Sequence, residues 1–347
     1  MSNLAKGAGN MNKRKICFEC GSKDDYQMKK VIRKYEGDDY SFELEVEAAF
    51  CKHCGAPIAD EEIEKSIRFQ ANNRIRKLRG IISQEEIIDI LNKYNVSQKF
   101  LSKLLGWGDI TLTRYISGGY TPNAENSKRL KELNNPYVFL MLLNEKVEAT
   151  NGEIKKELSY TKAYKKVNEE LQNLERKHGK IYNVVNWFLS QTTEENPMTH
   201  LALQKLLYFT QGWSSVLLNR WMFEDNCEAW VHGAVYRDVY EEFKFFKNKP
   251  LPMVNKENSL SNEEREVLED IRRNYFDIYN AKTLENICHK ERPYLIARNG
   301  LTEEQSSNEI IKKETIKQYY SEMAEKYSIS RENFDGVQEY LYKVLLR

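Results

Sequence analysis

The feature that most constrains the fold is a pair of Cys-x-x-Cys motifs near the start of the chain. Cys17 and Cys20 form the first motif, and Cys51 and Cys54 form the second after 30 intervening residues. In a reducing compartment this spacing favours one tetrahedral zinc ion over two disulfides. A glycine directly follows each motif, and glycine tolerates the positive φ of a tight knuckle. Because four thiolates leave no open coordination position, we expect one structural zinc ion and no catalysis at this site.

The segment between the two motifs predicts a β-hairpin. Residues 40–47 alternate between apolar and polar side chains, which is the period of a half-buried strand. Residues 31–35 are the expected partner strand, with residues 37–39 as the turn. Together these features predict a zinc ribbon over residues 11–60. His53 lies inside the second motif and is expected to be exposed rather than a ligand.

Charge divides the chain more clearly than its net value of +1 indicates. Residues 181–347 carry 21 Lys and Arg against 26 Asp and Glu, so the rear part is acidic and residues 1–180 are basic. Such asymmetry suggests different partners for the two parts. No apolar run approaches the ~20 residues that cross a membrane, and no secretory signal is visible, so we expect a cytoplasmic protein without a membrane partner. Residues 1–10 are interpreted as a disordered tail or a vector-derived remnant.

A basic stretch follows the ribbon. Residues 65–84 contain six basic side chains and no acidic one. Next to a DNA-reading motif such a stretch suits phosphate contact, for which Lys77 and Arg79 are the candidates. A solvated helix face is the alternative interpretation. The six residues are Lys65, Arg68, Arg74, Arg76, Lys77 and Arg79.

Three short helices are predicted after the basic stretch. Residues 83–86 read Ser-Gln-Glu-Glu, a capping box that begins a helix running to Tyr94. Ser97 caps a second helix over residues 98–105, which Gly106 ends. A third helix is expected over residues 109–117. Two short helices joined by a glycine-containing turn are typical of the arrangement that places one helix in the major groove of DNA.

The residues of these helices carry a family resemblance. Residues 96–106, read with Thr113, Arg114, Tyr115 and Gly118, are similar to a Cro/Xre-type helix-turn-helix. With the ribbon in front, the region resembles MqsA-like antitoxins, whose members repress their own promoters as dimers.

That resemblance implies a homodimer on double-stranded operator DNA. It assigns Arg114 to a base edge, places Thr111 and Thr113 nearby, and gives Gln98 a phosphate contact. The arginine fork independently matches O6 and N7 of guanine. Leu112 is expected in the core. Ile116 departs from the pattern, which usually has an acidic residue there.

The rear of the chain has a different composition. Residues 61–143 are interpreted as the helix-turn-helix domain, residues 144–180 as a helical connector or dimer contact, and residues 181–347 as a separate domain. The aromatic density of the last segment indicates its own core. Its histidines are scattered and no phosphate-binding glycine loop is visible, so no catalytic residue is predicted.

Three stretches of the rear domain carry a second resemblance. Residues 203–213, 228–235 and 284–294 resemble the Panacea domain, also called SocA/GepA-like. Members neutralise toxins of unrelated folds by binding them. Ala234 and Tyr294 depart from the family's usual proline and tryptophan. One polar set is expected to be structural rather than toxin-binding, which leaves the toxin-contact residues unassigned: Gln204, Lys205, Tyr208, Glu228, His232 and His289.

The sequence therefore predicts a mainly α protein with an N-terminal β zinc ribbon, a helix-turn-helix domain and a C-terminal helical Panacea-like domain. The predicted function is that of an antitoxin, not an enzyme, which binds a cognate protein toxin and autorepresses its operon. The alternatives are a stand-alone transcription regulator, whose rear domain senses a ligand or assembles oligomers, and a proteolytic adaptor with the same front end. A toxic gene beside this one would favour the antitoxin.

Overall fold

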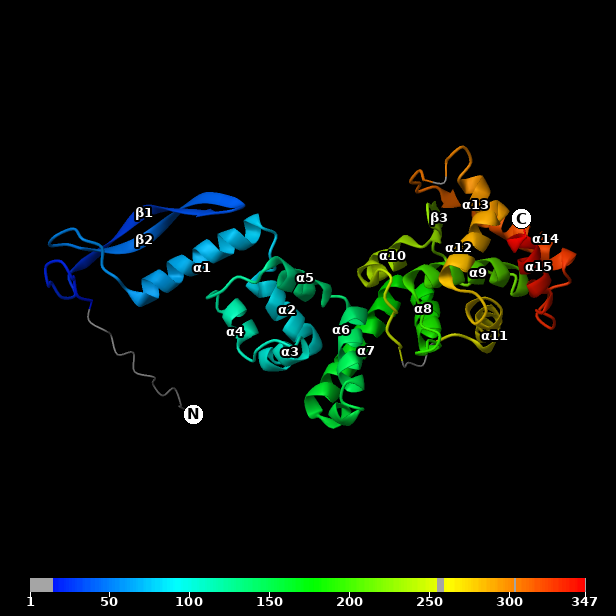
Figure 1. Ribbon diagram of the computed structural model, residues 1–347, viewed down its shortest axis with the longest axis horizontal. Helices are drawn as coiled ribbons and strands as arrows, with labels where there is room; N and C mark the ends of the chain where they lie inside the picture. Colours follow the sequence, from blue (N-terminus) through cyan, green and yellow to red (C-terminus); the bar gives the residue numbers. More distant parts are fainter. Residues whose placement is uncertain (1–14, 255–258, 303, 347) are drawn as a thin grey trace, which may run out of the picture. The chain divides into compact units, whose positions relative to one another are not determined.

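The computed structural model describes residues 15–254, 259–302 and 304–346. The tail predicted over residues 1–10 lies outside the described residues. The chain divides into two units between Lys131 and Glu132 (Figure 1). The sequence interpretation placed boundaries after residues 143 and 180 instead, so the observed division falls earlier in the chain.

The first unit begins with the predicted hairpin. Strand β1 (Tyr26–Gly37) pairs antiparallel with β2 (Tyr40–Cys51), and Val31 lies opposite Val46. Both strands are longer than the alternating segments in the sequence. Alternate residues of β2 are at least half-buried as far as Val46, and those between them are exposed, as the period-two pattern predicts.

Helix α1 (Glu61–Leu78) follows the hairpin and packs against β2. Asp60 caps it, because its side chain accepts a hydrogen bond of 2.9 Å from the Ile63 backbone N–H. Such a cap satisfies one of the donors that a helix start leaves without an intrahelical partner. Ile67 then packs with the buried β2 residues Val46 and Ala48.

Four helices complete the first unit: α2 (Gln84–Tyr94), α3 (Gln98–Leu104), α4 (Thr111–Ile116) and α5 (Ala124–Glu132). The predicted capping box of Ser83 and Glu86 is present at α2, and Ser97 caps α3. Gly106 adopts φ +74° after α3, a conformation open to glycine. The three helices predicted over residues 83–117 therefore form close to the expected bounds. Their shared core includes fully buried Ile87, Leu101, Leu104 and Leu112.

The second unit begins with helix α6 (Pro136–Glu148) and includes the segment expected to be a connector. That segment forms the 3-10 helix η1 (Glu153–Lys156) and helix α7 (Leu158–His178), which packs on α6 and on α8 (Lys180–Ser190). Its few apolar residues suffice because they share one helix face. The buried members of this face are Tyr160, Ala163, Val167 and Leu171.

Helix α9 (His200–Leu217) is the centre of the second unit. It packs against α11 (Asn262–Ile271), α12 (Ala281–Lys290) and α14 (Lys313–Lys326). Residues 202–215 of α9 are all buried, and an all-round buried helix is typical of the core of a large domain. The remaining helical elements are α10 (Arg237–Phe243), η2 (Lys244–Phe246), η3 (Arg272–Phe276), α13 (Arg292–Ala297) and α15 (Gly336–Leu345).

A small sheet lies beside these helices and was not expected from the sequence. Strands β3 (Cys227–Trp230), β4 (Gly233–Val235) and β5 (Ile310–Ile311) pair in the order β4-β3-β5. Each strand has at most four residues, too few for a periodic pattern to show. Throughout the described residues, no helix is both long enough and apolar enough to cross a membrane.

Candidate metal centre and nucleic-acid interface

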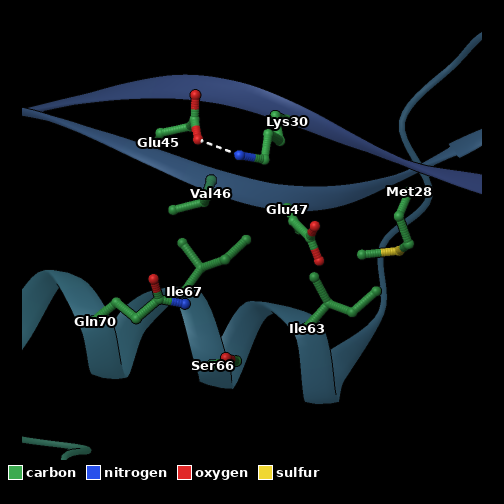
Figure 2. Close-up of a pocket in the computed structure, with 9 residues that line it drawn as sticks. All are labelled: Met28, Lys30, Glu45, Val46, Glu47, Ile63, Ser66, Ile67 and Gln70. Atoms are coloured by element: carbon green, nitrogen blue, oxygen red, sulfur yellow. Dashed lines mark hydrogen bonds and ion pairs between the residues drawn. The ribbon is translucent and has the colours of Figure 1, made fainter.

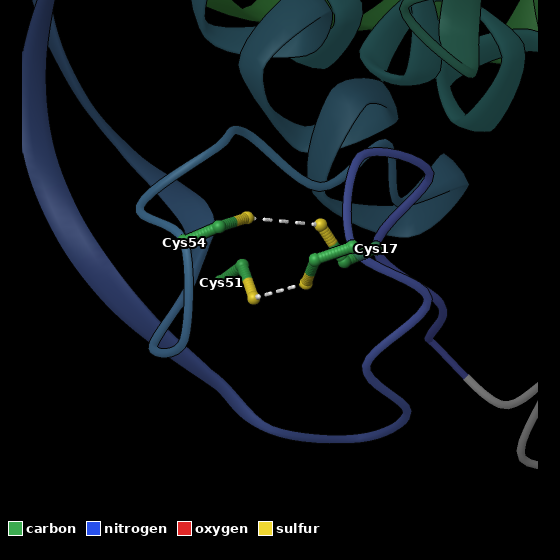
Figure 3. A group of neighbouring side chains, drawn as sticks. Cys17, Cys51 and Cys54 are labelled. Atoms are coloured by element: carbon green, nitrogen blue, oxygen red, sulfur yellow. Dashed lines mark hydrogen bonds between the residues drawn. The ribbon is translucent and has the colours of Figure 1, made fainter.

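The two cysteine motifs form matching knuckles that face each other. In each knuckle the glycine after the second cysteine donates its backbone N–H to the carbonyl of the first cysteine, at 2.9 Å for Gly21 and 3.0 Å for Gly55. Both glycines adopt positive φ, +72° and +77°, which confirms the reason given for them. The end of β2 thereby carries one pair of thiols toward the other pair (Figure 3).

The four thiols are close enough to share one ion. The Sγ atoms of Cys17 and Cys54 are 3.4 Å apart, those of Cys20 and Cys51 are 3.7 Å apart, and all four lie within 4.8 Å of one another. A tetrahedral zinc ion with bonds of ~2.3 Å would place its sulfur ligands about 3.8 Å apart. The donor set and its spacing therefore fit zinc.

Hydrogen bonds and burial shift the pKa values of the thiols in this cluster in different directions. The backbone N–H groups of Cys54 and His53 lower the pKa of Cys51 to about 6, because hydrogen bonds to a thiolate favour its charged form. The Ser22 N–H acts in the same direction on Cys20, but burial and the neighbouring thiols outweigh it and raise the pKa of Cys20 to about 12. Four thiolates together need a positive ion. The His53 side chain is exposed, as expected.

The predicted DNA-contact residues of α3 and α4 lie together on the first unit. Thr113 donates its hydroxyl to Oε1 of Gln98 at 2.8 Å, which links the start of α3 to α4. Arg114 is exposed, and Thr111 is half-buried. The guanidinium of Arg114 lies 5.5 Å from the ring centroid of Tyr120. Tyr120, which is 60% exposed, was missed because it lies outside the predicted helix.

The basic residues at the end of α1 and directly after it do not share one environment. Lys77 is exposed. Arg79 is paired with Asp39 of the hairpin turn at 2.9 Å, so a phosphate contact would compete with that ion pair. Arg76 is only 2% exposed, and this corrects its inclusion in a basic stretch suited to phosphate. Helical geometry explains the difference, because Arg76 falls on the face that packs inward.

Two further predictions for α4, the helix expected to contact DNA bases, concern Leu112 and Ile116. Leu112 is fully buried, as predicted. Ile116, where the Cro/Xre pattern usually has an acid, is half-buried. An apolar residue therefore suits this partly covered position.

The polar residues singled out on α9 are buried in the second unit. Gln204 accepts a hydrogen bond of 2.8 Å from the Tyr236 backbone N–H, and Lys205 donates to the Ala234 carbonyl at 2.8 Å. Both side chains are thus bonded to the β4 region. Burial lowers the pKa of Lys205, since a low dielectric disfavours its charge.

Glu291 is the centre of a network that the sequence analysis missed. Its carboxylate accepts hydrogen bonds from the hydroxyls of Tyr208 at 2.8 Å, Tyr320 at 3.0 Å and Tyr340 at 2.5 Å. Burial raises the pKa of Glu291 to about 7, although the three tyrosines oppose that rise. The donors are 83, 29 and 49 residues away in sequence, so no local motif reveals the network.

Two other polar residues from the same set lie nearer the surface. Glu228 accepts from Arg237 at 2.6 Å and from the Trp230 indole N–H at 2.7 Å. His232 is mostly exposed, with its Nδ1 3.3 Å from an oxygen of buried Glu285. Each therefore has a partner within the unit.

Two stretches of the chain match protein family models. Residues 15–145 match the model of the MqsA family, described as the antitoxin component of a bacterial toxin-antitoxin system. Residues 203–295 match the model of the SocA-like antitoxin Panacea domain. The chain is a fusion of an MqsA-like region and a Panacea domain. Both resemblances in the sequence are thereby confirmed, and an antitoxin role is supported. No curated protein matches the chain.

The two matches fall on different features of the structure. The MqsA-like region contains the four cysteines, α3 and α4, and it extends into α6 of the second unit. The Panacea region covers α9, the β3–β4 hairpin and α12, and it includes Glu291.

Proposed function

We propose that this chain is an antitoxin that holds one structural zinc ion, represses its own operon through α4, and neutralises a protein toxin with its second unit. The observation that carries this proposal is the joining of two antitoxin family matches in one chain. The cysteine cluster and the exposed Arg114 give the first region suitable chemistry. DNA binding and toxin neutralisation are therefore tested by separate experiments.

The DNA-binding part of the proposal rests on Arg114. Its exposed guanidinium can make two parallel hydrogen bonds to a guanine edge, with Thr113 and Gln98 beside it. A homodimer would place two such helices on the halves of a palindromic operator. Arg114→Ala should weaken operator binding by ~1–3 kcal/mol and relax base preference. Equal promoter affinity for Arg114→Ala and wild type, measured by fluorescence anisotropy, would place the recognition surface elsewhere.

The toxin-binding part assigns neutralisation to residues 132–347, a longer segment than the 181–347 inferred from composition. The longer segment keeps α6 and α7, which pack with α8. We expect residues 132–347, co-expressed with the neighbouring gene, to restore growth without repressing the promoter. Residues 1–131 are the matched control and should do the reverse. Rescue by the control alone would exchange the two assignments.

A ligand-sensing regulator is a second candidate, and one observation favours it. A cavity of about 830 Å³ lies in the second unit between α6, α7 and the segment 249–253. Apolar side chains form much of its lining, including Leu140, Met141 and Pro250, as in small-molecule sites. A neighbouring gene that is not toxic, together with operator binding that changes with a metabolite extract, would support this candidate over the antitoxin.

A further inference from the structure

Helix α1 contacts both the hairpin that carries the cysteines and α4, the helix expected to contact DNA bases. In its first half, Ile67 points toward Val46 of the hairpin and Ile63 lies below Glu47, and both isoleucines line a cavity of about 410 Å³ (Figure 2). Arg33 of β1 makes two hydrogen bonds to Glu64, at 2.9 and 2.7 Å. This half of the helix is thus attached to the hairpin by an apolar contact and a bidentate ion pair.

The second half of α1 contacts the turn that follows α4. Arg76 donates to the carbonyls of Tyr115 at 2.6 Å and Tyr120 at 3.0 Å, while Asn72 donates to the carbonyl of Gly118 at 2.7 Å. Phe69 packs over Gly118, where a Cβ atom would come within 2.3 Å of its ring. Gly118 also has φ +76°, so glycine is required there both for space and for conformation.

These contacts give α4 tertiary support and hydrogen-bond donors at its C-terminal end. Helix α4 has six residues, and so short a helix is marginal without tertiary support. The last carbonyls of a helix have no intrahelical donor. Arg76 supplies donors there, and its positive charge also suits the negative end of the helix dipole. The side chains of α1 therefore hold the end of α4 and the turn that follows it in place.

The turn after α4 places Tyr120 beside Arg114. The Arg114 guanidinium is 5.5 Å from the ring centroid of Tyr120, within the range of a cation–π contact. This contact restricts the directions in which the exposed Arg114 side chain can point. The turn is held at Gly118 by Asn72 and at Tyr120 by Arg76.

We propose that Asn72, Arg76 and Tyr120 are positioning residues for base recognition: α1 fixes the turn after α4, and the turn orients Arg114 through Tyr120. This inference rests on the proposed DNA-binding function. It makes α1 and the attached hairpin part of the reading unit rather than a separate module. Base discrimination then depends on Asn72 and Arg76, which act through the turn rather than through a base contact of their own.

The test uses the full-length, zinc-loaded protein and a duplex that wild type selects from a random DNA library. Affinity is measured for this duplex and for a scrambled duplex of the same composition. Asn72→Ala and Tyr120→Ala should each lower the ratio of the two affinities about tenfold, and Tyr120→Phe should restore it because the ring remains. Gln70→Ala is the matched control, since Gln70 is an exposed amide residue of the same helix and its loss should leave the ratio unchanged.

A double-mutant cycle separates positioning from general damage. In an Arg114→Ala background, Asn72→Ala should have little further effect on the ratio, because the residue through which it acts is gone. Circular dichroism and zinc content identify any variant that fails to fold, and Asn72→Ala, which removes one hydrogen bond, is the decisive one. If Asn72→Ala leaves the affinity ratio unchanged, or if its effect adds fully to that of Arg114→Ala, the positioning inference is wrong while the proposed DNA binding still stands. A wild type that selects no sequence overturns the proposed DNA binding together with the inference.

Discussion

Replacing Glu291 with glutamine should change how the stability of the second unit depends on pH. Glu291 is fully buried and accepts hydrogen bonds from three tyrosine hydroxyls. Burial raises its pKa from 4.5 to about 7. Glutamine is close to the protonated acid in shape and is neutral at every pH, so it removes the titration while filling the same space.

The sign follows from proton binding in the two states. The folded protein holds the Glu291 proton more tightly than the unfolded chain does, so stability is highest below the unfolded pKa of about 4.5 and is lost as pH rises toward 7. Each pKa unit corresponds to about 1.4 kcal/mol. The wild type should therefore lose about 2–3 kcal/mol relative to Glu291→Gln between pH 5 and pH 8.

Urea unfolding followed by tryptophan fluorescence measures this difference. A Trp107→Phe background restricts the signal to the second unit, which holds the other four tryptophans. Glu322→Gln is the matched control: Glu322 is only partly buried on α14, and its hydrogen bond from Arg292 lowers its pKa, so it stays ionised across the range. A difference between wild type and Glu291→Gln that stays constant from pH 5 to pH 8 would refute the reasoning.

Three further outcomes are expected. Cys17→Ser should lose the stoichiometric zinc and become protease-sensitive near the ribbon, whereas His53→Ala should retain the metal; wild type purified without zinc would contradict the site. Lys77→Gln should weaken binding to all DNA and lower its salt dependence, and Arg79→Gln should do so less, because Asp39 already pairs with Arg79; an equal or larger effect of Arg79→Gln would show that this pair opens on DNA. Gly212→Ala should destabilise the second unit by about 1–3 kcal/mol, since a Cβ atom there would come within 2.4 Å of the Tyr320 ring; an unchanged urea midpoint would exclude that clash.

Features that depend on local sequence were predictable. The spacing of the cysteines, the alternation in residues 40–47 and the cap at Ser83 each act within a few residues of the chain. The structure accordingly shows the cysteine cluster, the hairpin and α2 where they were expected. The two family resemblances also depend on local motifs and are confirmed by the family matches.

Features that depend on distant partners were not predictable. Arg76 and Lys77 are neighbours in a basic stretch, yet one is buried against carbonyls 39 and 44 residues away and the other is exposed. Composition alone cannot distinguish them, because only the packing of α1 against α4 decides which face is covered. The packing of the segment 144–180 was not visible in the sequence for a similar reason: its sparse apolar residues become a core face only once α6 and α8 lie beside α7.

The buried polar groups of the second unit affect how loss-of-function variants should be interpreted. Lys205 and Glu291 are fully buried, and both are hydrogen-bonded within the unit. Removing one partner of a buried polar pair leaves the other unsatisfied at a cost of about 1–3 kcal/mol, so variants there would lower the stability of the unit and reduce the proposed toxin rescue without touching a toxin. Residues that contact a toxin must instead be accessible in the free protein. A variant therefore identifies the toxin surface only if it abolishes rescue while the urea midpoint of the second unit stays at its wild-type value.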